Sequence, residues 1–413
     1  MFEFAPKTPP EALRLNQTVP SNPSIDSDST ALNEKQERKI AKNIERRSKR
    51  RARLPLKLAA TALAFSSLSS AYWHDVEANR TLAAESQPEI DAIGEHSFNL
   101  PNNTSTFYLA GFDTRDGVVF GDRVGVSIQE IIPSNSESID YGDAPLDPVE
   151  IAEQIIGHTG ERNLDSIALA GNSLGGIVAL EVAEYIILNT DIEIETIILN
   201  ATPDGSVGLR PGSQNGISAM IDWLKAVPGS RYSTYARYVA TMGQENNSYI
   251  HSENPIEAIA NIVETSEYVW DVVQERRRPG MWLLVDQALA VTNANVENII
   301  TNIGTQRGER RMPVIVYLRT TNPDDDQVVR VVESSENICE YAETANLSCE
   351  IVHVDGAVHT SYEFDTEAFS AGIAQRDSSI RNEIQQEAAQ YALNTYSDSY
   401  PNSIRAGENF YIR

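Results

Sequence analysis

The sequence predicts an α/β fold in which a mostly parallel sheet carries helices on both faces. Two observations support this prediction. Short apolar runs alternate along the chain with segments whose apolar residues recur at helical spacing. The runs are also apolar on both faces, which is typical of parallel strands covered by helices on two sides. A hydrophobic content of 41% over 413 residues is sufficient for one large core.

The strands and helices are expected to alternate from residue 105 onward, after a polar stretch at 79–104. Residues 122–131 are predicted as a strand because β-branched residues are frequent there. The full set of expected strands is 105–112, 122–131, 164–171, 192–203, 311–322 and 349–354. The expected helices are 146–160, 174–188, 335–345 and 366–396.

Residues 206–310 interrupt this alternation. They contain several helical patterns and no run comparable with the predicted strands. We therefore expect a helical cap insertion at 206–310, over the carboxyl edge of the sheet, between core segments 74–205 and 311–413. Most of its large side chains should serve helix packing, while some apolar ones line a substrate pocket. The large side chains concerned are Trp223, Trp270, Met281 and Trp282.

Charge divides the chain into a basic start and an acidic body. Residues 1–71 have a net charge of +6, and residues 72–413 have a net charge of −32. Residues 1–53, which are rich in Pro and Ser and then in Lys and Arg, predict a disordered, basic N-terminal tail. An acidic body repels polyanions, so nucleic acid is not expected as a partner.

An uncharged, apolar segment at 58–73 follows directly after the basic stretch 35–57. As a membrane anchor it would span 54–73. This order is typical of an exported chain, with the positive flank retained inside. Two versions remain open: a cleaved signal peptide, or an anchor that would give membrane association through 54–73. Export with an extracytoplasmic main domain is favoured over a cytoplasmic protein in which the segment is a buried helix.

The two cysteines, Cys339 and Cys349, exclude a disulfide scaffold and a cysteine-built metal site. They lie at a predicted helix start and at the following strand, close enough for one bridge. A disulfide in an oxidising compartment and two buried thiols are equally compatible with the sequence.

The stretch Gly171-Asn172-Ser173-Leu174-Gly175 follows a predicted strand and opens a predicted helix. This is the context of a nucleophile elbow, in which a strained turn lifts the serine hydroxyl clear of the sheet. Glycines two residues before and after the serine avoid collisions with neighbouring backbone. The sequence therefore predicts Ser173 as a nucleophile, with the backbone N–H of Leu174 as an oxyanion donor at a helix N-terminus.

A serine nucleophile needs a base and an acid that orients the base, and in such a sheet they follow the serine in the order acid, then histidine. His359 lies in the loop after the last predicted strand, whereas His353 lies within that strand, so His359 is the predicted base. Three aspartates follow the fifth predicted strand. Among them Asp326 is the first choice for the acid and Asp325 the second.

The second oxyanion donor should come from the end of the first predicted strand, in the loop that follows FYLA at 107–110. The sequence Ala110-Gly111-Phe112-Asp113 offers the backbone N–H of Phe112 at that position.

The motifs GNSLGG, NPDDDQVV and GAVHT together resemble those of the α/β-hydrolase fold superfamily, in particular serine esterases and lipases with a helical cap insertion. The resemblance covers roughly residues 105–395. It implies an eight-stranded, mostly parallel sheet. It also implies hydrolysis of an ester, or of a thioester or amide, through a covalent intermediate on the serine, with no cofactor and no metal. The expected substrate is a small-molecule or lipid acyl compound.

Two other functions remain open on the sequence. The same fold can transfer the acyl group to an acceptor other than water. A protein of this fold can also be a non-catalytic binding protein, but such proteins usually lose one member of the triad, and here all three positions are filled.

Overall fold

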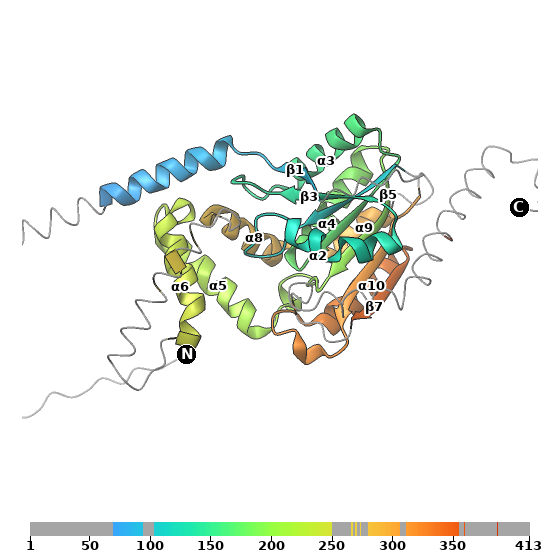
Figure 1. Ribbon diagram of the computed structural model, residues 1–413. Helices are drawn as coiled ribbons and strands as arrows, with labels where there is room; N and C mark the ends of the chain where they lie inside the picture. The colour runs from blue at the N-terminus through green and yellow to red at the C-terminus, as the bar shows by residue number, and fades with distance from the viewer. Residues whose placement is uncertain are drawn as a thin grey trace, which may run out of the picture. The chain divides into compact units, whose positions relative to one another are not determined.

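A seven-stranded, mostly parallel sheet organises the chain in the computed structural model (Figure 1). The structure describes residues 69–93, 103–249, 280–305 and 311–354, with the isolated residues Ser266, Val269, Trp270, Val273, His359 and Gln386. The strand order is β1-β3-β2-β4-β5-β6-β7, and every neighbouring pair is parallel except the antiparallel pair β1–β3. The strands are β1 (Glu89–Ala92), β2 (Thr104–Leu109), β3 (Asn135–Asp140), β4 (Ser166–Asn172), β5 (Glu193–Asn200), β6 (Val314–Thr320) and β7 (Cys349–Val354). The predicted fold class is confirmed; against the eight strands that the resemblance implied, the described residues form seven.

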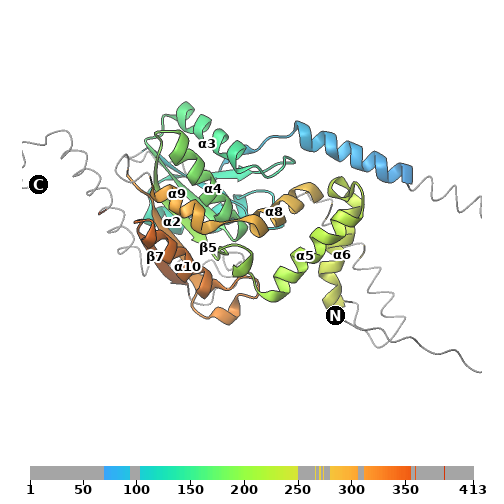
Figure 2. The same cartoon turned by 180° about the vertical axis from the view of Figure 1, so that it is seen from behind.

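Helices cover both faces of the sheet, as predicted. On one face, α3, α4, α9 and α10 lie side by side (Figure 2). They pack over the apolar side chains of one set of strand residues. On the other face, α2 covers the alternate set, so that Phe107 and Leu109 face the first layer while Tyr108 faces α2. The helices are α2 (Val118–Ile131), α3 (Pro148–Arg162), α4 (Leu174–Asn189), α5 (Pro211–Ala226), α6 (Thr234–Tyr249), α8 (Met281–Asn293), α9 (Val296–Gly304) and α10 (Val331–Thr344).

Most predicted elements coincide with observed ones within a few residues. The strands expected at 105–112, 164–171, 192–203, 311–322 and 349–354 are β2, β4, β5, β6 and β7. The helices expected at 146–160, 174–188 and 335–345 are α3, α4 and α10. The closing helices expected at 366–396 and the disordered tail expected at 1–53 lie outside the described residues.

The strand predicted at 122–131 is wrong, because these residues belong to α2. The buried side chains Phe120, Val124 and Ile128 recur every four residues and pack on the sheet. Gly121 and Gly125 lie against the ring of Tyr108, which brings the helix close to β2. Packing on the sheet therefore outweighs the strand preference of the β-branched residues.

Two strands were missed because their sequences are polar. β1 lies within the polar stretch at 79–104 and pairs with β3 at the edge of the sheet. β3 has the sequence NSESID, yet Glu137 and Ser138 are fully buried there. Glu137 is compensated by Arg162, whose Nη1 donates to it at 2.7 Å.

The described part of the segment between β5 and β6 contains four longer helices, α5, α6, α8 and α9, and adds no strand to the sheet. The helices α5, α6 and α8 pack on one another around an apolar cluster that includes Met281 and Leu284, and Phe112 from the core packs against it. Trp282 is buried, and its Nε1 donates to the carbonyl of Asp143 at 2.7 Å. α9 instead packs on α4 and α10, within the helical layer of the sheet.

A helix over residues 69–85 precedes the sheet and contacts the start of α6. The Asp75 carboxylate accepts hydrogen bonds from the Thr234 N–H at 2.8 Å and from the Ser233 hydroxyl at 3.1 Å. Asn79 donates to the carbonyl of Tyr232 at 2.8 Å. Of the segment at 54–73, only residues 69–73 are described; within the described residues, no helix has both the length and the apolar character to cross a membrane.

A disulfide joins Cys339 of α10 to Cys349 at the start of β7, which decides between the two alternatives for these cysteines. It closes a loop with a sequence separation of 10 residues. A cross-link of this span restricts the unfolded chain and stabilises the fold by about 2–3 kcal/mol.

The disulfide predicts a redox-dependent stability. Urea unfolding of the wild-type protein with dithiothreitol should give a free energy of unfolding about 2–3 kcal/mol below that of the oxidised protein. The variant Cys339→Ser/Cys349→Ser should match the reduced wild type and should not respond to the reductant. Equal wild-type stability with and without dithiothreitol, with thiol titration confirming reduction, would contradict this prediction.

Candidate active site

Ser173 occupies the sharp turn between β4 and α4. Its backbone has φ 53° and ψ −119°, a left-handed conformation that L-residues with side chains rarely adopt. The turn is held by two backbone hydrogen bonds: the Ser173 N–H donates to the carbonyl of Asn200 at 2.7 Å, and the Gly176 N–H donates to the carbonyl of Ser173 at 3.0 Å. The serine therefore stands at the carboxyl edge of the sheet in a fixed orientation.

Two glycines around the serine are required by close backbone approach. A Cβ on Gly171 would lie 2.2 Å from the carbonyl oxygen of Gly175, and a Cβ on Gly175 would lie 2.3 Å from that of Leu109. Both obstacles are backbone atoms, which cannot move aside without moving β2 or α4. The spacing of glycines seen in the sequence thus has the predicted steric cause.

His359 and Asp326 complete a hydrogen-bonded chain that begins at Ser173. The Nε2 atom of His359 lies 3.0 Å from the Ser173 Oγ, and its Nδ1 atom lies 2.9 Å from the Asp326 Oδ2. Asp326 is fully buried, and its Oδ1 accepts the N–H groups of Val328 at 2.9 Å and Val329 at 2.8 Å. Both carboxylate oxygens are therefore engaged, and one of them is directed at the imidazole.

The alternative candidates for the acid and the base, Asp325 and His353, lie away from Ser173. Asp325 accepts a hydrogen bond from the side chain of Asn322 at 2.8 Å, in an exposed turn after β6. His353 lies within β7, with its Nε2 3.5 Å from the Arg319 Nη2. Among the alternatives left by the sequence, the structure brings Asp326 and His359 to Ser173.

The two N–H groups expected as oxyanion donors belong to the residue after Ser173 and to the residue after Gly111. Leu174 is the first residue of α4, and Gly111, which precedes Phe112, lies against Ser173: a Cβ on Gly111 would be 3.5 Å from the Ser173 Cβ. Within the part of the chain that the structure describes, neither the Phe112 N–H nor the Leu174 N–H donates to a protein acceptor. Neither N–H group is taken up by another described residue, so each has a free donor for an acceptor from outside the chain.

Buried tyrosines fix the carboxyl ends of the neighbouring strands. The Tyr317 hydroxyl donates to the carbonyl of Thr202 at 2.6 Å. Burial, helped by the charges of Asp326 and Asp204, raises the pKa of Tyr317 well above its ordinary value. Burial likewise raises the pKa of Tyr141, whose hydroxyl donates to the carbonyl of Ala110 at 3.1 Å. Both phenols stay protonated and act as structural donors.

Sequence reasoning missed two side chains that hold the loop after β2. Gln287 of α8 and Arg237 of α6 both contact this loop, although they are more than 100 residues away in sequence. Neither belongs to a motif, and a polar residue in a helical pattern is expected on the solvent side. No sequence signal distinguishes them from surface residues.

The strand order, the strand–serine–helix turn and the helical segment between β5 and β6 together define an α/β-hydrolase fold. No family model and no curated protein sequence matches the chain.

Several solved structures are similar to this chain at low sequence identity. An esterase from Exiguobacterium antarcticum has 14% identity and a TM-score of 0.43, covering 70% of this chain and 94% of its own. A carboxyl esterase from Bacillus coagulans has 11% identity and a TM-score of 0.46, covering 72% and 99%. A lipase-esterase related protein from Clostridium acetobutylicum has 12% identity and a TM-score of 0.43, covering 70% and 99%.

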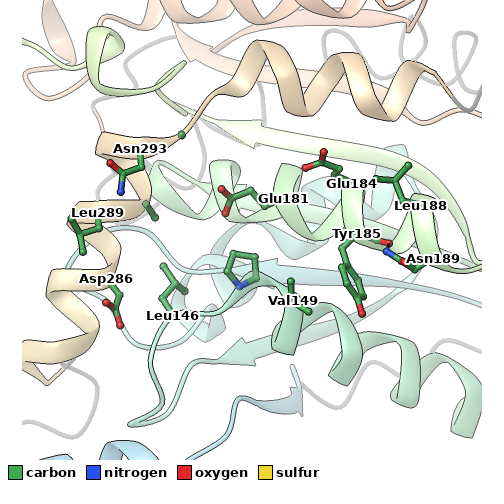
Figure 3. A pocket seen from close by; sticks show the side chains of 13 residues that line it. Leu146, Val149, Glu181, Glu184, Tyr185, Leu188, Asn189, Asp286, Leu289 and Asn293 are labelled. Carbon is green, nitrogen blue, oxygen red and sulfur yellow. Dashed lines mark hydrogen bonds between the residues drawn. The ribbon is translucent and has the colours of Figure 1, made fainter.

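A separate groove of about 520 Å³ lies between α3, α4 and α8, and none of Ser173, Asp326 and His359 lines it (Figure 3). Its walls are largely apolar, but Glu181, Glu184 and Asp286 also contribute carboxylates. Burial raises the pKa of Glu181 to about 7, and the charge of Glu184 adds to the rise. Within the described residues, no three Asp, Glu, His or Cys side chains are arranged to hold a metal ion.

The raised pKa of Glu181 predicts a pH-dependent stability. A carboxyl whose pKa is about 7 when folded and about 4.5 when unfolded contributes stability below the lower value, which is lost as the pH rises through the higher one. We therefore compare the free energies of unfolding of Glu181→Gln and the wild type, measured by urea unfolding. The difference between them should move by about 1–3 kcal/mol in favour of the variant as the pH rises from 5 to 8. The gain should shrink in a Glu184→Gln background. A difference between Glu181→Gln and wild type that does not change with pH would refute the assignment.

Proposed function

We propose that this protein is a serine hydrolase that cleaves a carboxylic ester through an acyl intermediate on Ser173. The observation that supports it is the continuous hydrogen-bonded chain from Ser173 through His359 to buried Asp326. In this arrangement a hydroxyl, a base and an acid that orients the base act as one unit. The strained turn at Ser173 presents the hydroxyl to that base.

In the first half-reaction, the Nε2 of His359 takes the proton of the Ser173 hydroxyl while Oγ attacks the ester carbonyl carbon. The carbonyl oxygen becomes an oxyanion, and the N–H groups of Leu174 and Phe112 stabilise it. The imidazolium then gives its proton to the leaving alcohol as the carbon–oxygen bond breaks. Asp326 holds the Nδ1–H of His359 throughout, and thereby keeps Nε2 directed at the serine.

In the second half-reaction, His359 takes a proton from water, which attacks the acyl carbon. The same two N–H groups stabilise the second oxyanion, and the acid leaves as Ser173 recovers its proton. No cofactor or metal takes part in this scheme. The proposed substrate is a small-molecule or lipid ester; thioesters and amides would react by the same steps.

We also propose that the catalytic part of the chain is exported or membrane-anchored. The Cys339–Cys349 disulfide supports this, because disulfides persist mainly in oxidising compartments. The basic stretch at 35–57, followed by the apolar segment at 58–73, agrees with it.

Removing the nucleophile tests the proposal directly. The variant Ser173→Ala should lose at least about 10³-fold in kcat for p-nitrophenyl ester hydrolysis, and should no longer be labelled by a fluorophosphonate probe. Ser206→Ala, outside the hydrogen-bonded chain, is the control and should keep both. Undiminished hydrolysis by Ser173→Ala would remove this serine from the mechanism.

The same assay separates the open alternatives. Folded wild-type protein that resists fluorophosphonate labelling would favour a non-catalytic binding protein. An ester product that dominates over the free acid when an alcohol is present would identify an acyltransferase.

Replacing the acid tests the role of Asp326. In Asp326→Asn, the amide faces the imidazole with a donor where the histidine requires an acceptor, so kcat should fall by about 10²–10⁴-fold. Asp325→Asn is the matched control and should stay within about 3-fold of wild type, since Asp325 only closes a surface turn. Loss of activity in Asp325→Asn alone would reverse the assignment.

A further inference from the structure

The loop that follows β2 is held by one buried amide from α8. The side chain of Gln287 is fully buried. Its Oε1 accepts the N–H of Asp113 at 3.0 Å, and its Nε2 donates to the carbonyls of Thr114 at 2.8 Å and Gly111 at 3.4 Å. One side chain thus binds three backbone groups within four consecutive residues.

These hydrogen bonds bracket Phe112 and leave its N–H without a protein acceptor among the described residues. The carbonyls of the two residues before Phe112 are also engaged: that of Ala110 accepts the Tyr141 hydroxyl, and that of Gly111 accepts the Thr114 hydroxyl at 2.7 Å. A rotated peptide between Gly111 and Phe112 would break the bonds to the Gly111 carbonyl. The orientation of the Phe112 N–H is therefore coupled to the position of Gln287.

The loop also needs outside support because its backbone is strained. Asp113 has φ 64°, a left-handed conformation for a residue with a side chain. Its carboxylate forms an ion pair with Arg237 of α6, whose side chain is 2% exposed. The two contacts come from two different helices of the segment between β5 and β6, and both converge on Asp113.

We propose that Gln287 is a positioning residue for catalysis, and that α8 sets the second oxyanion donor by holding the loop 111–114. The inference rests on the proposed function, since it concerns the donor that the hydrolytic mechanism uses. α8 then has a direct part in the chemistry: with α8 displaced, the Phe112 N–H loses its fixed orientation and the oxyanion keeps only the Leu174 donor.

The test is Gln287→Met, which keeps the length of the side chain and removes all three hydrogen bonds. Loss of one oxyanion donor lowers kcat by about 10²–10³-fold in other serine hydrolases. We expect a fall in kcat of about 30-fold or more, with KM within about 3-fold of wild type, because the donor acts on the transition state. The inhibition constant of an alkyl trifluoromethyl ketone, whose adduct with Ser173 carries an oxyanion, should rise in proportion to the loss in kcat/KM.

Asp286→Asn is the matched control. Asp286 is the adjacent residue of α8, and it pairs with Arg231 at 2.5 Å rather than with the loop. This variant also loses a partly buried contact of α8, so its melting temperature should fall as that of Gln287→Met does. Its kcat and its ketone inhibition constant should stay near the wild-type values. Gln287→Glu is the second variant if the methionine protein does not fold, because it keeps the acceptor for the Asp113 N–H and replaces the amide donor.

The outcomes separate this inference from the proposed function. A Gln287 variant that folds and keeps kcat within about 3-fold of Asp286→Asn, while Ser173→Ala is inactive, would overturn the positioning role alone. Active Ser173→Ala protein would overturn the proposed function, and with it this inference. A loss in kcat without a matching rise in the ketone constant would also overturn the inference, because a structural defect elsewhere would then explain it.

Discussion

The left-handed backbone of Ser173 is the constraint on which the rest of the site depends. A residue with a side chain holds that conformation only when its surroundings enforce it. Here the enforcing contacts are the hydrogen bonds to the Ser173 N–H and carbonyl and the close approach of backbone at Gly171 and Gly175. These contacts need β4, β5 and α4 in their observed places, so the geometry of one serine depends on a tightly packed sheet.

The parallel sheet explains how distant residues meet at that serine. The carboxyl ends of β2, β4 and β6 lie at one edge, and the loops after them supply Phe112, Ser173 and Asp326, while His359 follows β7. Asp326 illustrates how such a loop is fixed: one carboxylate oxygen closes a turn on two N–H groups, and this leaves the other oxygen oriented toward His359. The disulfide ties α10 to the start of β7, the strand that leads to the histidine loop.

Sequence patterns predicted what depends on local spacing and failed where burial reverses the usual preferences. The run that becomes β4, the glycines around Ser173 and the continuous apolar face of α4 all have direct spacing signals. The helix α2 was misread because its β-branched residues favour a strand, and only packing against Tyr108 selects the helix. β3 was missed because buried Glu137 reads as a surface residue until Arg162 is known to face it.

Gln287 and Arg237 are also buried polar residues that the sequence pattern would place at the surface. A buried amide or guanidinium is stable only if its hydrogen bonds are satisfied, so each fixes the backbone or carboxylate that satisfies it. Gln287 uses both ends of its amide on the loop 111–114, whereas Arg237 bonds Asp113 and the hydroxyl of Thr241. With apolar residues at positions 237 and 287, a shift of α6 or α8 would break no hydrogen bond to the loop. The polar side chains of Gln287 and Arg237 couple the conformation of the loop to the packing of α6 and α8. The loop cannot change, and the helices cannot move, without breaking these hydrogen bonds.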